Sequence, residues 1–393
     1  MTKSLMKKIV ILGQRAEAIP AVNGGAVATL MEMLIAENES QKKLDLTIIC
    51  CDDEKARQKA RDYPYTKFIF LRESSTAKVI YRLLKYGNKI FPLLSRIMKS
   101  SYLWQAYCLL KTMADVEWLV VEEDCQVTGY YKFSDLPMSV AYHSHLHEIP
   151  QTRPLYDRII VVSQFCQNPW LSYYDEKDIK ICYNAIDLNL FTRMISNDIK
   201  LKLRAELGFG SKDIIVLYVG RILAVKGVRE LVKAVAAIND ESIKLLLVGG
   251  TGFAEAQKNT YELQIDEMIA ENKHKMIHIG YMSNDKLWQY YQLADIQCIP
   301  SLWEEAAGLV AIEGMASGLP LIVTQSGGMT EYVSEECAVI IERNENLINN
   351  LRQEIIKLAY NPQKRKVMGE KSFNRAKRFT QKQYYENFIS AIS

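Results

Sequence analysis

Two glutamates in the segment EEAAGLVAIE, Glu305 and Glu313, stand eight positions apart with only uncharged residues between them. The apolar run DIQCIP before them is typical of a buried strand, and the later GLVAIEGMAS is typical of a helix. Glu305 is therefore expected in the loop and Glu313 about one to two turns into the helix. The backbone N–H groups of Ala307, Gly308 and Leu309 would form the helix N-terminus, which attracts anions.

This arrangement predicts a ligand that carries both phosphate and hydroxyl groups. Carboxylates accept hydrogen bonds from neutral hydroxyls, and Gly308 allows a ligand to approach the backbone closely. A phosphate flanked by two polyols, as in a nucleoside diphosphate sugar, fits these features. The alternative is that both glutamates are solvated surface acids.

A pair of cations, Arg221 and Lys226, lies in the segment YVGRILAVKGVRELVKA, between a strand that ends at Gly220 and a helix. Residues that follow a strand of a parallel sheet lie at its carboxyl end, where ligands bind. Arginine offers a planar fork of donors to a phosphate, and lysine offers a point charge. The pair is interpreted as phosphate-binding, and the alternative is two exposed loop cations.

A glycine pair, Gly24 and Gly25, follows the first expected strand and opens a helix in AIPAVNGGAVATLMEMLI. Glycine permits close approach of the backbone to a phosphate or a sugar. We expect Gly25 to lie at the phosphates of the sugar-donating ligand. We expect Gly24 in the adjoining loop or at the second substrate, the acceptor of the sugar. The pattern is neither a dinucleotide fingerprint nor a P-loop, so by itself it is weak.

Three of the five histidines, His143, His145 and His147, lie at the end of an expected strand in AYHSHLHEIP. Strand alternation would place all three on one face if the strand continued. No further cluster of cysteine and histidine completes a metal site, and acidic strand exits such as VEEDC are common without a metal. We therefore expect a single reacting histidine and no metal.

Short apolar runs alternate with helical patterns along the whole chain, which predicts parallel sheets covered by helices. Twelve strands in two sheets suggest two facing Rossmann-like domains with a cleft between them. We expect an N-terminal domain over residues 1–186 and a C-terminal domain over 187–377, with a helix over 378–393 that packs back on the first. The expected strands are 7–13, 45–51, 67–71, 117–121, 139–143, 158–163, 213–220, 243–250, 276–281, 295–300, 319–324 and 338–342.

Length and composition agree with a two-domain globular protein: 393 residues, of which 49% are hydrophobic and 24% charged. The net charge of +3 does not indicate a nucleic-acid partner. No apolar run reaches the roughly 18 residues of a membrane span, and the N-terminal apolar patch reads as a strand rather than a signal peptide. The eight cysteines form no Cys-x-x-Cys motif and are interpreted as buried thiols in a reducing compartment, the cytoplasm.

One segment is locally basic: residues 74–114 contain seven lysines and arginines and no acid. Lys78, Arg82, Lys85 and Lys89 fall on one helical stripe with tyrosines nearby. Each cation near an anionic bilayer contributes about 1 kcal/mol. We expect peripheral binding to the inner face of the cell membrane, and the alternative is the solvated face of a core helix.

In this order the segments resemble the retaining glycosyltransferases of family 4, which have the two-domain GT-B fold. The resemblance covers nearly the whole chain and is most specific in the Glu-x7-Glu segment with its following GMASGLP. Within this family, the sequence is similar to bacterial members that build surface polysaccharides or coats. The matching segments are NGGAV, VVSQF, YNAIDLNLF, GRILAVKG, PSLWEEAAGLVAIEGMASGLPLI and SGGMTEYV.

The resemblance implies a role for each matching residue of the donor site. Glu313 resembles the glutamate that holds the nucleotide ribose, and Glu305 the one that contacts donor-sugar hydroxyls. Arg221 and Lys226 match the pair that clamps the donor pyrophosphate, together with the backbone at residues 307–309. The donor is a nucleotide diphosphate sugar, expected to be a UDP-sugar, and no cofactor or metal is required.

The resemblance also implies that a histidine at a strand exit of the N-terminal domain lies at the reacting centre. His147 is the expected residue and His145 the contender. The acceptor is expected to be a lipid-pyrophosphate-linked saccharide or a glycan.

Two rival functions remain at this stage. A nucleotide-sugar epimerase of the same fold would turn over the donor alone, without an acceptor or a membrane surface. A non-catalytic glycosyltransferase subunit would only bind. The presence of all the matching polar residues favours the transferase.

Overall fold

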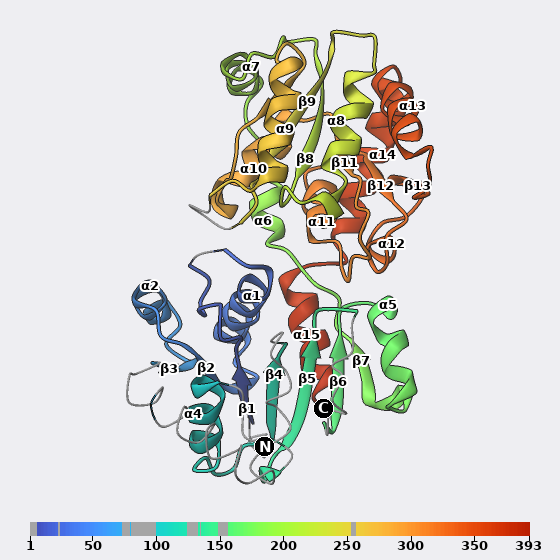
Figure 1. Ribbon diagram of the computed structural model, residues 1–393. Helices are drawn as coiled ribbons and strands as arrows, with labels where there is room; N and C mark the ends of the chain where they lie inside the picture. The colour runs from blue at the N-terminus through green and yellow to red at the C-terminus, as the bar shows by residue number, and fades with distance from the viewer. Residues whose placement is uncertain are drawn as a thin grey trace. The chain divides into compact units, whose positions relative to one another are not determined.

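The computed structural model describes residues 6–22, 24–72, 79, 100–123, 133, 135–147, 156–252 and 257–393. The chain forms two compact units, one of Met1–Tyr183 with Tyr384–Ser393 and one of Asn184–Gln383. Each unit is a parallel sheet covered by helices, which confirms the expected α/β class (Figure 1). The first crossing between the units falls after residue 183, where the sequence places the boundary after residue 186.

The first unit contains a seven-stranded sheet in the order β3-β2-β1-β4-β5-β6-β7 within the described residues. All its neighbouring strands are parallel, and β1 contributes Ile9 to Leu12 to the buried core. Parallel strands buried on both faces require such apolar runs. The strands are β1 (Lys7–Leu12), β2 (Leu44–Cys51), β3 (Lys67–Leu71), β4 (Trp118–Glu122), β5 (Ser139–Ser144), β6 (Arg158–Val161) and β7 (Ile179–Ile181).

The helices of the first unit connect these strands, and the last one returns from the far end of the chain. The Tyr385 hydroxyl of this last helix donates to Asn38 Oδ1 at 2.6 Å, and Arg158 Nη1 donates to the Ala391 carbonyl at 2.7 Å. Figure 1 shows it in red among the blue and green elements of this unit. The helices are α1 (Ala26–Gln41), α2 (Glu54–Lys59), α4 (Ser101–Leu110), α5 (Gln164–Gln167) and α15 (Gln381–Ala391).

The second unit contains a six-stranded parallel sheet in the order β10-β9-β8-β11-β12-β13. Its order reverses between β8 and β11, so the loops that follow these two strands diverge to opposite faces and leave a binding position at their carboxyl ends. The strands are β8 (Ile214–Val219), β9 (Ile243–Val248), β10 (Met276–His278), β11 (Ile296–Ile299), β12 (Leu321–Thr324) and β13 (Ala338–Ile341).

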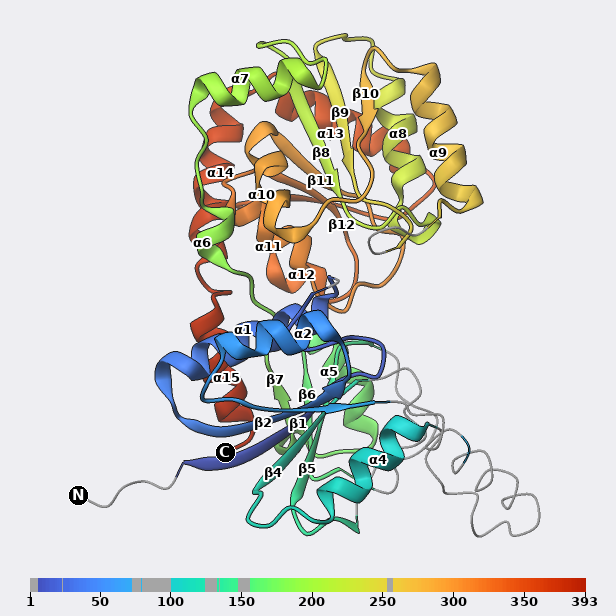
Figure 2. The same cartoon turned by 90° about the vertical axis from the view of Figure 1, so that its left-hand side faces the viewer.

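Helices cover both faces of the second sheet, and α8 packs against α9 and α13 while α11 packs against α14 (Figure 2). The apolar sides of α8, α9 and α13, with those of the strands, form one buried core. The helices are α6 (Leu188–Phe191), α7 (Asn197–Glu206), α8 (Val228–Ala236), α9 (Thr260–Glu271), α10 (Asn284–Leu293), α11 (Leu309–Ala316), α12 (Met329–Tyr332), α13 (Leu347–Ala359) and α14 (Pro362–Ala376).

All twelve expected strands are present, most of them shorter by one to three residues at an end. The sequence prediction missed β7, because a three-residue edge strand carries too short a pattern to separate it from a loop. The expected membrane stripe of Lys78, Arg82, Lys85 and Lys89 lies outside the described residues. No helix among the residues that are described is long and apolar enough to cross a membrane.

Candidate functional site

The loop that follows β8 is held against the loop that follows β11. The carbonyl of Val225 accepts hydrogen bonds from the backbone N–H groups of Leu302 at 2.8 Å and Trp303 at 3.1 Å. Gly227 has φ +68°, and a Cβ at this position would lie 1.9 Å from the Pro300 carbonyl oxygen. Only glycine permits this approach, which fixes the two loops side by side at the carboxyl ends of their strands.

This junction brings together two residues that the sequence singled out 79 positions apart. The Lys226 ammonium lies 2.5 Å from Glu305 Oε1, and the Ser301 hydroxyl donates to the same oxygen at 2.7 Å. The Glu305 backbone N–H donates to Ser326 Oγ at 3.1 Å. The side chains of Lys226 and Glu305 are 20% and 18% exposed, so the pair is fixed in place but remains reachable from solvent.

Arg221 follows β8 directly after Gly220, and its side chain is exposed. Its carbonyl accepts a hydrogen bond from the Tyr218 hydroxyl at 2.7 Å, which fixes the backbone from which the guanidinium extends. Arg221 and Lys226 therefore belong to one short loop at one strand end.

Helix α11 begins at Leu309 with Gly308 at its N-cap. Neither a side-chain cap nor an acidic residue in the first turn satisfies its N-terminal N–H groups. Uncapped groups of this kind carry the positive end of the helix dipole and suit an anion. The residues expected at the phosphates, Ala307 to Leu309, thus lie at an open helix N-terminus, as the sequence predicted.

Glu313 is the fifth residue of α11, and its carboxylate accepts a hydrogen bond from the Tyr291 hydroxyl at 2.7 Å. Burial raises the pKa of Glu313 to about 7, although the Tyr291 hydrogen bond lowers it. Tyr291 is itself fully buried on α10. The sequence analysis did not identify Tyr291, because one tyrosine in an amphipathic helix resembles any core aromatic.

The glycine pair of the first unit opens α1, with Gly25 at its N-cap at φ +106°. Glu17 Oε2 accepts a hydrogen bond from the Ala28 N–H at 3.0 Å, and a Cβ on Gly25 would lie 2.8 Å from the Glu17 carboxylate. The N-terminus of α1 thus holds an anion of its own. A donor phosphate at Gly25, or a group at the neighbouring Gly24, would have to displace this carboxylate.

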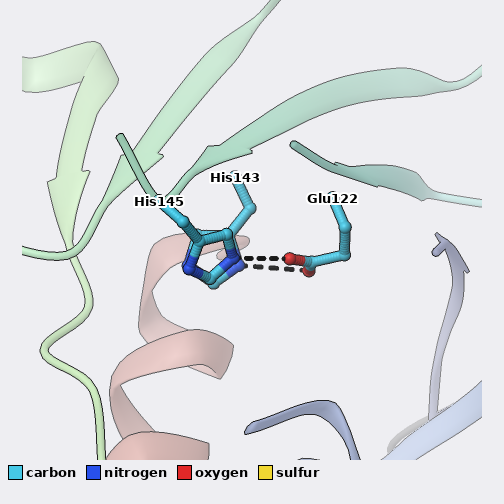
Figure 3. A group of neighbouring side chains, drawn as sticks. All are labelled: Glu122, His143 and His145. Atoms are coloured by element: carbon cyan, nitrogen blue, oxygen red, sulfur yellow. Dashed lines mark hydrogen bonds and ion pairs between the residues drawn. The ribbon is translucent and has the colours of Figure 1, made fainter. Parts of the chain in front are cut away.

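Two of the three clustered histidines share one buried carboxylate (Figure 3). His143 Nδ1 lies 3.1 Å from Glu122 Oε1, and His145 Nε2 lies 2.8 Å from Glu122 Oε2. Glu122 and His143 are register partners on β4 and β5, and both are fully buried. Burial favours the neutral carboxyl, but the two imidazoles outweigh it and hold the pKa of Glu122 at about 2.

The next residue, Glu123, fixes the backbone that carries the histidines. Its Oε2 accepts hydrogen bonds from the Ser144 hydroxyl at 3.1 Å and from the N–H groups of His145 at 2.5 Å and Leu146 at 2.8 Å. Burial raises the pKa of Glu123. The two glutamates of the acidic exit VEEDC, which the sequence analysis did not assign to the site, therefore both contact the histidine segment.

His147 is separate from this cluster, because β5 ends at Ser144 and the alternation of faces ends with it. Its ring packs 5.6 Å from that of Phe165. The three histidines thus divide into a carboxylate-bound pair, His143 and His145, and His147 two residues further on, and the prediction that one of them reacts stays a prediction.

Comparison with known proteins agrees with this architecture. Residues 199–375 match the family model of glycosyl transferases group 1. The chain is 29% identical to an uncharacterised glycosyltransferase of Methanocaldococcus jannaschii over 46% of this chain and 45% of that protein. It is 24% identical to spore coat protein SA of Bacillus subtilis over 98% of both chains.

The fold is similar over nearly the full length to that of Anabaena HepE in complex with UDP and glucose. The TM-score is 0.73 at 18% identity, with 98% of this chain and 99% of that one covered. The chain therefore has the two-domain fold of GT-B glycosyltransferases, and its residues 199–375 are similar to glycosyl transferases group 1.

Proposed function

We propose that the protein transfers a sugar from a nucleotide diphosphate sugar to an acceptor, with retention of anomeric configuration as in family 4. The contact between Lys226 and Glu305 beside the open N-terminus of α11 carries this proposal. It sets a cation, a hydroxyl-binding carboxylate and unsatisfied N–H groups at neighbouring strand ends. A sugar diphosphate has the matching groups: hydroxyls on one side and two phosphates on the other.

In this proposal the diphosphate binds between Arg221, Lys226 and the N–H groups of residues 307–309. These donors stabilise the negative charge that develops on the leaving diphosphate, and removal of one such donor costs about 10²–10³ in rate. They provide the positive charge that a metal ion would otherwise supply, so the donor site needs no added metal. Glu305 accepts from the sugar hydroxyls, and Glu313 accepts from the ribose.

The base is proposed to be uracil. The support is that the Anabaena protein of similar fold binds UDP and glucose. The sugar itself is left open, because Ala306 and Ala307 replace bulkier or more constrained residues of the family pattern.

The acceptor is proposed to bind the first unit, with His147 at the reacting centre and His145 held back by Glu122. A lipid-pyrophosphate-linked saccharide of surface polysaccharide or coat synthesis is the proposed acceptor, supported by the full-length similarity to a spore coat protein. The basic stripe that includes Lys85 would then place the enzyme on the cytoplasmic face of the membrane.

The test measures release of nucleoside diphosphate from a panel of nucleotide sugars, with and without lipid extract from the source cell. Release that requires extract supports the transferase, and the responding donor names the base and sugar. Conversion of the nucleotide sugar into another nucleotide sugar, in the absence of extract and with no release of nucleoside diphosphate, would instead show an epimerase. No turnover in either arm, with binding of UDP intact, would indicate a non-catalytic subunit.

Lys226→Ala is the matched variant for this assay, with a loss of about 10²–10³ in turnover expected. Lys371→Ala is its control, because Lys371 also pairs with a carboxylate, Glu336 at 3.0 Å, but on an exposed surface. Surface pairs of this kind contribute little, so this variant should keep full activity. Equal activity of both variants would remove the donor-site assignment.

A further inference from the structure

The cluster of Glu122, His143 and His145 has the composition of a metal site. The three candidate ligand atoms lie within 4.8 Å of one another. Two histidines with one carboxylate form the ligand set of several zinc enzymes, with further positions left for water. Nitrogen and carboxylate ligands together suit Zn²⁺ and its first-row neighbours rather than Mg²⁺ or Ca²⁺.

The fold, rather than chance contact, places these ligands on one face. His143 lies in β5 and His145 directly follows its last residue, Ser144, and the centroids of the two rings are 4.2 Å apart. Glu122 is the register partner of His143 on the adjacent strand β4, and its side chain meets both rings. Figure 3 shows the two imidazoles side by side, both directed at the carboxylate.

The distances are close to those of an occupied site. Ligand atoms bound to Zn²⁺ at about 2.0–2.1 Å in a tetrahedron lie about 3.3 Å apart. The two nitrogen–oxygen distances here are 3.1 and 2.8 Å. Separation of each pair by a few tenths of an ångström would admit the ion, without any change of strand position.

The charge around the cluster also favours a cation. Glu122 is fully buried, and the carboxylate of Glu123 lies on the backbone N–H of His145. Glu17, at the N-terminus of α1, is close enough to interact electrostatically with both Glu122 and His145. A bound ion would place positive charge among these three carboxylates while the imidazoles that bind it are neutral.

We propose that Glu122, His143 and His145 bind one divalent transition-metal ion of the Zn²⁺ type. The ion takes the His143 Nδ1 and His145 Nε2 lone pairs and the Glu122 carboxylate, whose two oxygens each face one of these nitrogens. A proton held by either nitrogen leaves to solvent or moves to the other nitrogen of the same ring. It ties the end of β4 to the end of β5 and so positions the segment that carries His147. None of its three ligands belongs to the proposed donor site, and binding of the ion can be measured without sugar transfer.

The test uses the full chain, freed of metal with a chelator that is then removed. Zn²⁺ is titrated calorimetrically, and Co²⁺ is titrated by visible absorption, which reports ligand type. One equivalent is expected, with a Co²⁺ spectrum of nitrogen and oxygen ligation that lacks intense thiolate charge-transfer bands. Absence of stoichiometric binding would overturn the proposal, as would a thiolate spectrum, because free cysteines such as Cys108 are exposed.

Two variants and one control locate the ion. Glu122→Gln and His145→Ala should each weaken Zn²⁺ binding at least about 100-fold, beyond the 10–100-fold loss typical of outer-shell partners. His145→Ala leaves Glu122 paired with His143, so its fold should persist if Glu122→Gln does not fold. His274→Ala is the control, because His274 also faces a glutamate but is 56% exposed. Binding that survives both variants, or that is lost only in the control, would show that the ion lies elsewhere.

Discussion

Glu313 provides the sharpest test of the donor site, because its proposed function conflicts with stability. Glu313 is half-buried on α11, and its carboxylate accepts a hydrogen bond from Tyr291. Burial raises its pKa from an ordinary value of 4.5 to about 7. Each unit of pKa shift corresponds to 1.36 kcal/mol, so ionisation of Glu313 in the folded chain costs about 3 kcal/mol.

The sign of this cost follows from proton binding. Between pH 4.5 and 7 the folded state holds a proton that the unfolded state has lost, so stability falls as pH rises through this range and is constant above it. Glu313→Gln cannot ionise and keeps an oxygen for the Tyr291 hydroxyl. The variant should therefore exceed the wild type by about 3 kcal/mol at pH 8 and by less than about 1 kcal/mol at pH 5.

The same substitution should weaken the proposed ribose contact. A hydrogen bond to a charged acceptor contributes about 1.5–3 kcal/mol, so UDP affinity at pH 8 should fall about 10–100-fold. Thermal melts at pH 5 and 8 and calorimetric titration with UDP measure the two effects. Glu336→Gln, an exposed carboxylate, is the control and should change neither.

The two readouts can fail separately. A variant that melts lower than the wild type at pH 8, or with an unchanged dependence on pH, would refute the buried charge at Glu313. Unchanged UDP affinity with the expected stabilisation would refute the ribose contact alone.

Two further predictions concern the packing that holds each unit together. Gly227→Ala should destabilise the chain by about 2–4 kcal/mol and abolish UDP binding, because its Cβ would overlap the Pro300 carbonyl as well as carry the strain of φ +68°. Gly208 has φ +76° with nothing within 4 Å of an added Cβ, so Gly208→Ala should lower the free energy of unfolding by only about 1–2 kcal/mol. Equal destabilisation by the two variants would contradict the close approach of Gly227 to Pro300. Tyr385→Phe removes the hydrogen bond to buried Asn38, so it should lower the free energy of unfolding by about 1 kcal/mol and speed hydrogen exchange in α15. Unchanged exchange would show that this bond does not hold the helix in place.

The fold class and the proximity of Lys226 to Glu305 could be predicted from sequence because both depend on local pattern. Buried parallel strands are near-continuous apolar runs, so the strands from β8 to β13 were visible without knowledge of their neighbours. Lys226 and Glu305 each follow a strand, and ligands bind at the carboxyl ends of parallel strands, so the two residues were expected at the same edge of the sheet. The structure shows them in contact. Tyr291 was not predicted, because the hydrogen bond that makes it part of the site goes to Glu313, which lies on a different helix.

The histidine cluster could not be predicted in the same way, since it depends on register. Glu122 and His143 are 21 residues apart, and only the parallel pairing of β4 with β5 sets them opposite each other. A shift of one residue in that pairing would turn one of the two side chains to the other face of the sheet. The sequence showed a histidine triplet and an acidic strand exit as two separate features, and neither alone indicated a metal site. Their combination in one buried group is what makes Glu122 a candidate ligand, so a search for metal sites in parallel sheets should compare strand exits in pairs.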